Sequence, residues 1–162
     1  MKLQISKNLP RKPLLILPFL ISSFAFASVS FDVTDADVEK SLSEVEDARE
    51  VCLNMEDNQN TSGQIACTHT AYQSADDVLN KYYQEILKSL SDPGLQAQKT
   101  QYMSVRRRIV ESEKAWITFR DANSQLAGIS DMGTPMDDLD IQNSLYSMTV
   151  DRVRELEKIV LP

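Results

Sequence analysis

The sequence contains very little glycine, with four residues in 162, at positions 63, 94, 128 and 133. Each of them lies at or near a place where a helical repeat of apolar residues stops, as expected if the glycines mark the turns between helices. No stretch shows the sustained alternation of apolar and polar residues that is typical of a β-strand. These two absences predict an all-α protein.

The sequence also lacks the residue patterns of most enzymes. No nucleophile elbow, phosphate-binding loop or HExxH motif occurs, and no two carboxylates stand out as a pair for glycoside cleavage. The single histidine, His69, lies on an apolar helical face, so we interpret it as a core or seam residue rather than a catalytic one. We therefore expect a binding protein, with no catalytic residues, no cofactor and no metal site.

Basic residues are outnumbered, 17 against 24 acidic residues, and four of the 17 lie among the first twelve positions. They precede "LLILPFLISSFAF", an apolar run too short to cross a bilayer, which ends in the small–aromatic–small sequence Ala25-Phe26-Ala27. We interpret residues 1–27 as a cleaved export signal rather than an uncleaved anchor. The expected product is one domain, residues 28–162, in the periplasm or outside a bacterial cell, with no membrane anchor.

The chain that remains after residue 27 has 13 basic and 24 acidic residues, a net charge of −11. Nucleic acids and anionic membranes repel such a chain. The charge favours a cationic protein partner, although it would equally serve to keep an exported protein soluble.

Two cysteines are present, Cys52 and Cys67, and an even number in an oxidising compartment predicts a disulfide.

Apolar residues three and four positions apart predict four helices. The first begins with Thr34 as N-cap and Asp37 at its third position, a variant of the capping box. The second spans about residues 62–90 and the third about residues 95–127, separated by a "SDPG" turn. The fourth begins with Asp137 or Asp138 as its cap and ends near residue 160. We expect a small bundle of about four helices, with the second and third forming a long antiparallel hairpin.

The apolar stripe of each long helix predicts which side chains face the core. The stripe of the second helix is Ile65, His69, Tyr72, Asp76, Leu79, Tyr83, Ile86 and Leu90, and that of the third is Tyr102, Val105, Ile109, Ser112, Trp116, Phe119, Asn123 and Leu126. Trp116 and Phe119 are therefore interpreted as core residues. Arg120 lies at the edge of the stripe, with its stem on apolar surface and its head in water, or in a partly buried ion pair.

Asp76 is unusual because an unpaired carboxylate on an apolar seam is costly. We expect it to have a cationic or hydrogen-bonding partner. A chain that turns back at residue 93 brings position 76 level with 110 on the third helix and near 156 on the fourth. This favours Arg152 over Arg120, which lies about ten residues, roughly 15 Å, off that level. The arginines at 106–108 are a third option.

Three blocks of the sequence together resemble the LprI-type lysozyme inhibitor family over about residues 50–157: "CLNMEDNQNTSGQIACTHTAYQSADDVLNKYYQEIL", "AWITFRDAN" and "MTVDRVREL". The positions that match the family pattern include Cys52, Cys67, Asp76, Asn80, Arg120, Asp121 and Arg152. The resemblance implies a small exported helical protein whose partner is lysozyme, with Asp76, Asn80, Arg120, Asp121 and Arg152 in a structural polar core. It also implies inhibition of a c-type lysozyme by occlusion of its cleft.

The chain departs from the family at a second cysteine pair, because Ser124 and Ser144 stand at those positions. The segment 125–143 then loses a covalent tether. That segment holds the acidic residues that we expect to contact a partner: Asp131, Asp137, Asp138 and Asp140. The acidic face of the first helix is a second candidate surface. The alternative function is that of an interaction or accessory protein of the cell envelope with no role toward lysozyme.

Overall fold

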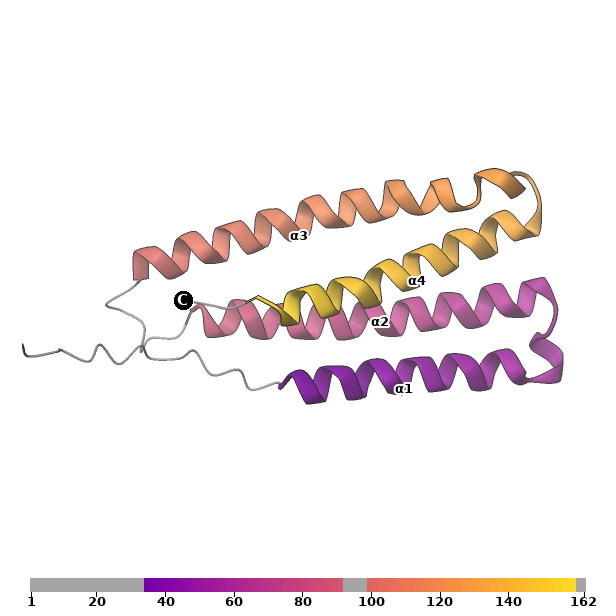
Figure 1. The fold of residues 1–162 in the computed structure, drawn as a ribbon, viewed down its shortest axis with the longest axis horizontal. Helices are drawn as coiled ribbons and strands as arrows, with labels where there is room; N and C mark the ends of the chain where they lie inside the picture. The colour runs from indigo at the N-terminus through magenta and orange to yellow at the C-terminus, as the bar shows by residue number, and fades with distance from the viewer. Residues whose placement is uncertain (1–33, 92–98, 160–162) are drawn as a thin grey trace, which may run out of the picture.

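The computed structural model describes residues 34–91 and 99–159, which form an elongated bundle of four long helices (Figure 1). These are α1 (Asp35–Asn54), α2 (Thr61–Ser89), α3 (Lys99–Ala127) and α4 (Pro135–Glu157), with short 3-10 turns η1 (Glu56–Asn58) and η3 (Ile129–Asp131). Within these two segments there is no β-strand, so the predicted all-α class is confirmed. The predicted export signal, residues 1–27, lies outside the described residues.

The helix starts agree with the sequence at α1 and differ at α4. At α1, Thr34 Oγ1 accepts the N–H of Asp37 at 3.2 Å and Asp37 Oδ2 accepts the N–H of Thr34 at 3.0 Å, which is the predicted capping box. At α4 the predicted cap is wrong, because Thr134 is the N-cap and Pro135 follows it. Proline at the first helical position has its φ already set for a helix. Asp137 and Asp138 fall in the first turn, where the helix dipole favours acids.

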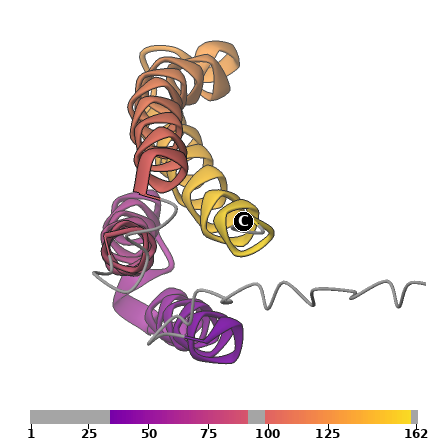
Figure 2. The ribbon, with the colours of Figure 1, turned by 90° about the vertical axis from the view of Figure 1, so that its left-hand side faces the viewer.

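The helices pack around α4. It makes the most extensive contact with α2 and is also the main neighbour of α3, while α1 packs against α2. The two long helices α2 and α3 run in opposite directions (Figure 1). Viewed from the end, α3 lies above α2, and α4 lies to one side of both helices (Figure 2). The two long helices therefore meet through their side chains rather than through close backbone packing.

The large apolar side chains gather toward one end of the bundle, where α2 ends and α3 begins. They come from all four helices: Val38, Leu42, Leu79, Tyr82, Ile86, Leu87, Leu90, Tyr102, Ile109, Val153 and Leu156. Toward the opposite end a smaller cluster contains Val45, Ala71, Ala75 and Tyr146. Because hydrophobic stabilisation follows buried apolar area, the second end depends more on other interactions.

A disulfide lies at that second end, between Cys52 at the end of α1 and Cys67 in the first turns of α2, with the two Cα atoms 5.7 Å apart. This is the bond that the sequence predicts. The turn between the two helices is tight, because a Cβ added at Gly63 would come within 2.4 Å of the Asn58 Cα. Covalent closure and a close backbone approach therefore hold α1 against α2 where the apolar core is thin.

The buried face of α3 follows the predicted stripe only in its first half. Tyr102 and Ile109 are buried as expected, but in the second half the buried side chains are Glu113, Arg120 and Ser124. The prediction that Phe119 is a core residue is wrong, since it is 57% exposed. Trp116 is partly buried and packs against the main apolar cluster. The face turned inward here is therefore polar, which gives the bundle a charged interior on this side.

Candidate functional site

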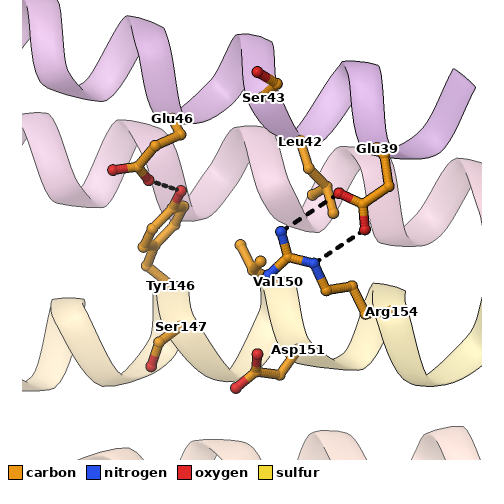
Figure 3. A pocket seen from close by; sticks show the side chains of 9 residues that line it. All are labelled: Glu39, Leu42, Ser43, Glu46, Tyr146, Ser147, Val150, Asp151 and Arg154. Carbon is orange, nitrogen blue, oxygen red and sulfur yellow. Dashed lines mark hydrogen bonds and ion pairs between the residues drawn. The ribbon is translucent and has the colours of Figure 1, made fainter. Parts of the chain in front are cut away.

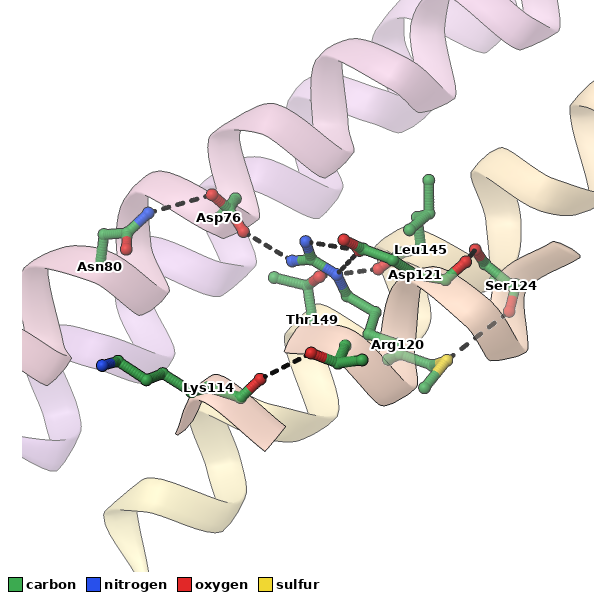
Figure 4. A network of polar contacts seen from close by, with 11 residues as sticks. Asp76, Asn80, Lys114, Arg120, Asp121, Ser124, Leu145 and Thr149 are labelled. Atoms are coloured by element: carbon green, nitrogen blue, oxygen red, sulfur yellow. Dashed lines mark hydrogen bonds and ion pairs between the residues drawn. The ribbon is translucent and has the colours of Figure 1, made fainter. Parts of the chain in front are cut away.

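Arg120 is the centre of the polar interior (Figure 4). Its side chain is 7% exposed, and Nη1 donates to Asp76 Oδ1 at 2.8 Å while Nε donates to Asp121 Oδ1 at 2.9 Å. The guanidinium carbon lies 5.3 Å from the Tyr72 ring centroid and 5.1 Å from that of Trp116. Planar arginine suits this combination of carboxylate and aromatic neighbours better than lysine does. One arginine thus joins α3 to α2.

Asp76 is held from both sides in this network. While one of its carboxylate oxygens accepts from Arg120, the other accepts from Asn80 Nδ2 at 3.0 Å (Figure 4). Burial acts to lower the pKa of the Arg120 guanidinium, but its hydrogen bonds with Asp76 and Asp121 raise it, and the net shift is upward. Arg120 is therefore held as a cation despite its burial.

The preference for Arg152 as the partner of Asp76 is wrong. The alignment argument places the turn of the hairpin at residue 93, whereas α3 begins beyond the end of α2 (Figure 1). This stagger moves Arg120 to the level of Asp76, where it makes the ion pair. The long arginine side chain covers the remaining gap between the helices.

Arg152 belongs to a second ion pair that the sequence did not predict. Its Nε and Nη2 both donate to Glu113 Oε2 at 3.0 Å, and Nη1 donates to Glu155 Oε2 at 3.0 Å. Trp116 separates the two arginines, with its ring centroid 5.5 Å from the Arg152 guanidinium carbon. Sequence reasoning missed Glu113, although its position seven residues before Arg120 places both on one helical face. The two pairs together join α2, α3 and α4.

These contacts fit a structural role for the polar interior. Both arginines and both of their principal carboxylate partners are engaged with one another across the helices. His69 is exposed rather than in the core, and its Nδ1 lies 3.0 Å from Gln142 Oε1. Among the described residues no cluster of His, Cys, Asp or Glu side chains is arranged to bind a metal ion. The arrangement can hold the helices together.

The predicted acidic surface lies at one end of the bundle, in a segment that we call the α3–α4 tip, residues 126–140 (Figure 1). It contains Asp131, Asp137, Asp138 and Asp140, of which Asp138 is exposed and the others are partly buried. No cationic side chain in the two described segments forms an ion pair with any of the four. Their negative charge is thus not neutralised by an ion pair with any described residue.

The backbone of the tip is closely held despite the serines at the two positions of the absent cysteine pair. Ser124 is fully buried and donates to the Asp121 carbonyl at 3.1 Å, and Ser144 donates to Met148 Sδ at 3.7 Å. Gly128 permits the close approach of α4, because a Cβ there would come within 2.7 Å of the Asp137 backbone oxygen. Gly133 has a φ of +85°, which favours glycine.

A second acidic surface is a groove of about 560 Å³ between α1 and α4 (Figure 3). Its carboxylates are partly engaged: Arg154 Nε donates to Glu39 Oε1 at 3.1 Å, and the Tyr146 hydroxyl donates to Glu46. Arg154, the one basic residue among the described lining residues, is thus paired within the groove. The groove therefore presents less free negative charge than the α3–α4 tip.

Tyr146 should ionise only at very high pH. Its burial and its hydrogen bond to the Glu46 carboxylate raise its pKa to about 12, against about 10 for an unfolded tyrosine. Because the folded pKa is raised, the associated stability is complete below about pH 10 and is lost as the pH rises through about 12. An ultraviolet titration of tyrosinate should show a step near pH 12 that disappears in Tyr146→Phe. Persistence of that step in the variant would assign it to another tyrosine.

No helix in the described segments is both long and apolar enough to cross a membrane. Residues 52–156 match the family model described as "Lysozyme inhibitor LprI". The chain is also similar to the uncharacterized protein R02472 of Rhizobium meliloti (strain 1021), with 27% identity over 96 residues that cover 58% of this chain and 69% of that protein. No solved structure matches the chain significantly.

Proposed function

The chain belongs to the LprI lysozyme inhibitor family, and on that premise we propose that it is an exported binding protein that inhibits a c-type lysozyme by occluding its substrate cleft. The family membership carries this proposal. The polar interior supports a binding role over an enzymatic one, because its arginines and carboxylates are paired with one another. A rigid helical bundle with an acidic end suits the blocking of a cationic enzyme.

The distribution of charge points to the α3–α4 tip as the contact. The tip, residues 126–140, contains four aspartates and no lysine or arginine. The exposed arginines 106, 107 and 108 lie in the first third of α3, toward the opposite end of the bundle (Figure 1). The molecule therefore has an acidic pole, which would steer association with a cationic partner.

The proposal is tested by the rate at which a c-type lysozyme lyses cell walls. Residues 28–162 at saturating concentration should slow lysis at physiological salt and should degrade nothing alone. A neutral muramidase assayed in parallel, and a repeat at high salt, separate a packed interface from charge attraction, which salt screens. An unchanged lysis rate at physiological salt would end the inhibitor proposal and leave the envelope accessory role in its place.

Two charge-matched variants should locate the contact. Neutralising Asp131, Asp138 and Asp140 to asparagine spares Asp137, whose carboxylate accepts the Gly133 N–H at 3.5 Å. The control neutralises three exposed acids of α1, Glu44, Asp47 and Glu50, to the corresponding amides. Both variants lose the same charge, so long-range attraction falls equally. We expect inhibition to weaken about tenfold more in the tip variant, and a stronger loss in the α1 variant would move the contact to α1.

A further inference from the structure

Exposed apolar side chains gather on the same end as the unpaired aspartates. Among the described residues ten large hydrophobic side chains are exposed, and five of these lie between positions 119 and 136. They are Phe119, Leu126, Ile129, Met132 and Met136, with Met132 the most exposed at 72%. Exposed apolar side chains that occur singly need no explanation, whereas a cluster rimmed by polar groups is typical of an interaction site.

The tip presents these side chains on a backbone that is already ordered. The N–H of Asp131 donates to the Gly128 carbonyl at 3.0 Å, and the N–H of Thr134 donates to the Asp131 carbonyl at 3.0 Å. Thr134 Oγ1 donates to the same carbonyl at 2.8 Å, and Thr134 then caps α4. A loop held in this way has less conformational entropy to lose on binding. The apolar side chains therefore do not need a disulfide to hold them in place for a partner.

The charge around the exposed apolar cluster indicates which kind of partner can bind it. Anionic lipid is repelled by the four aspartates of the tip, none of which forms an ion pair within the described residues. A second copy of this chain, docked tip to tip, would place those aspartates against one another. A cationic protein surface satisfies both features, because it complements the acids and can bury the apolar side chains.

We propose that the α3–α4 tip inserts into the cleft of a cationic cell-wall-cleaving enzyme, with Leu126, Ile129, Met132 and Met136 as its apolar anchor. This inference rests on the proposed function and adds the residues that carry the affinity. The aspartates form the rim of the contact and govern the rate of association, while the buried apolar side chains govern dissociation. Methionine suits such an anchor because its flexible side chain adapts to an irregular pocket.

The test compares two pairs of substitutions with similar exposure. The tip variant carries Ile129→Gln and Met132→Gln, at positions 56% and 72% exposed. The control carries Val51→Gln and Met55→Gln, at positions 60% and 53% exposed at the C-terminal end of α1, which lies at the same end of the bundle (Figure 1). Because all four side chains are largely exposed, both variants should fold, and circular dichroism verifies this.

Binding to a c-type lysozyme is then measured by surface plasmon resonance at two salt concentrations. The tip variant should raise Kd by roughly 10- to 100-fold, through faster dissociation and with unchanged salt dependence. The control should stay within about twofold of wild type. Equal Kd values for the two variants would overturn the inference alone. If the wild-type chain does not bind lysozyme, both the proposed function and the inference are overturned. If the wild-type chain forms a dimer that the tip variant abolishes, the tip contacts a second copy of the chain and the inference is overturned.

Discussion

Replacing Arg120 with alanine is expected to lower the free energy of unfolding by about 3 kcal/mol. The substitution removes an ion pair with Asp76 and a side chain that packs between the rings of Tyr72 and Trp116. Asp76 then keeps only its hydrogen bond from Asn80. For a bundle of this size the melting temperature should fall by roughly 10 °C, as measured by thermal denaturation followed by circular dichroism.

Two further variants separate the charge of Arg120 from its shape. Arg120→Lys keeps the charge but cannot reach both carboxylates in the geometry of a guanidinium, so it should recover only part of the loss. Asp76→Ala should cost less than Arg120→Ala, because Asp121 still neutralises the arginine at 2.9 Å. An Arg120→Ala protein with an unchanged melting temperature would show that the polar interior does not hold α3 to α2.

Removing the disulfide is expected to have a comparable effect. The double variant Cys52→Ser, Cys67→Ser opens a loop with a sequence separation of 15, and the chain-entropy account gives a loss of about 3 kcal/mol. The free energy of unfolding should fall measurably, because the apolar cluster at this end is small. Chemical denaturation measures it, with the reduced wild type as the matching control. A loss below about 0.5 kcal/mol would mean that packing alone holds this end, and two free thiols in denatured, unreduced protein would show that the bond is absent.

The sequence predicted the helices well because their signals are local. Helical periodicity and the Thr34 capping box each depend on neighbouring residues. The predicted "SDPG" turn extends into residues 92–98, which lie outside the described residues. Where the core is made of large apolar side chains, as at Tyr102 and Ile109, the stripe also predicted the buried face. In the first half of α2 it failed, because the residues buried there are Cys67, Thr68, Ala71 and Ala75. Alanine is a weak signal when buried positions are predicted from apolar periodicity. Its small size nevertheless permits the close approach of α4.

The charged interior could be anticipated but not assigned from the sequence. Asp76 was recognised as needing a partner, because a carboxylate on a seam is costly. Its actual partner depends on the stagger between α2 and α3, which no local pattern encodes. Glu113 was missed and Phe119 was wrongly placed in the core for another reason. A pattern of apolar residues selects an aromatic side chain as buried and a glutamate as exposed. The glutamate is buried only because Arg152 reaches it from α4.

The absence of the second cysteine pair changes how the tip is stabilised. The sequence suggested that segment 125–143 would lose its tether at Ser124 and Ser144. In the structure Ser124 is fully buried, as is Thr149 of α4. The Gly128 approach and the Thr134 cap order the turn between the helices. Noncovalent contacts thus take the place of a covalent bond at the end that we propose to bind lysozyme.

Occlusion of the lysozyme cleft is most directly tested by competition with an N-acetylglucosamine oligosaccharide that occupies the same cleft. If the tip fills the cleft, the apparent Kd of this protein for a c-type lysozyme should rise in proportion to the oligosaccharide concentration, and the two ligands should never be bound together. An apparent Kd that stays constant while the oligosaccharide saturates the enzyme would place the contact elsewhere and contradict the account.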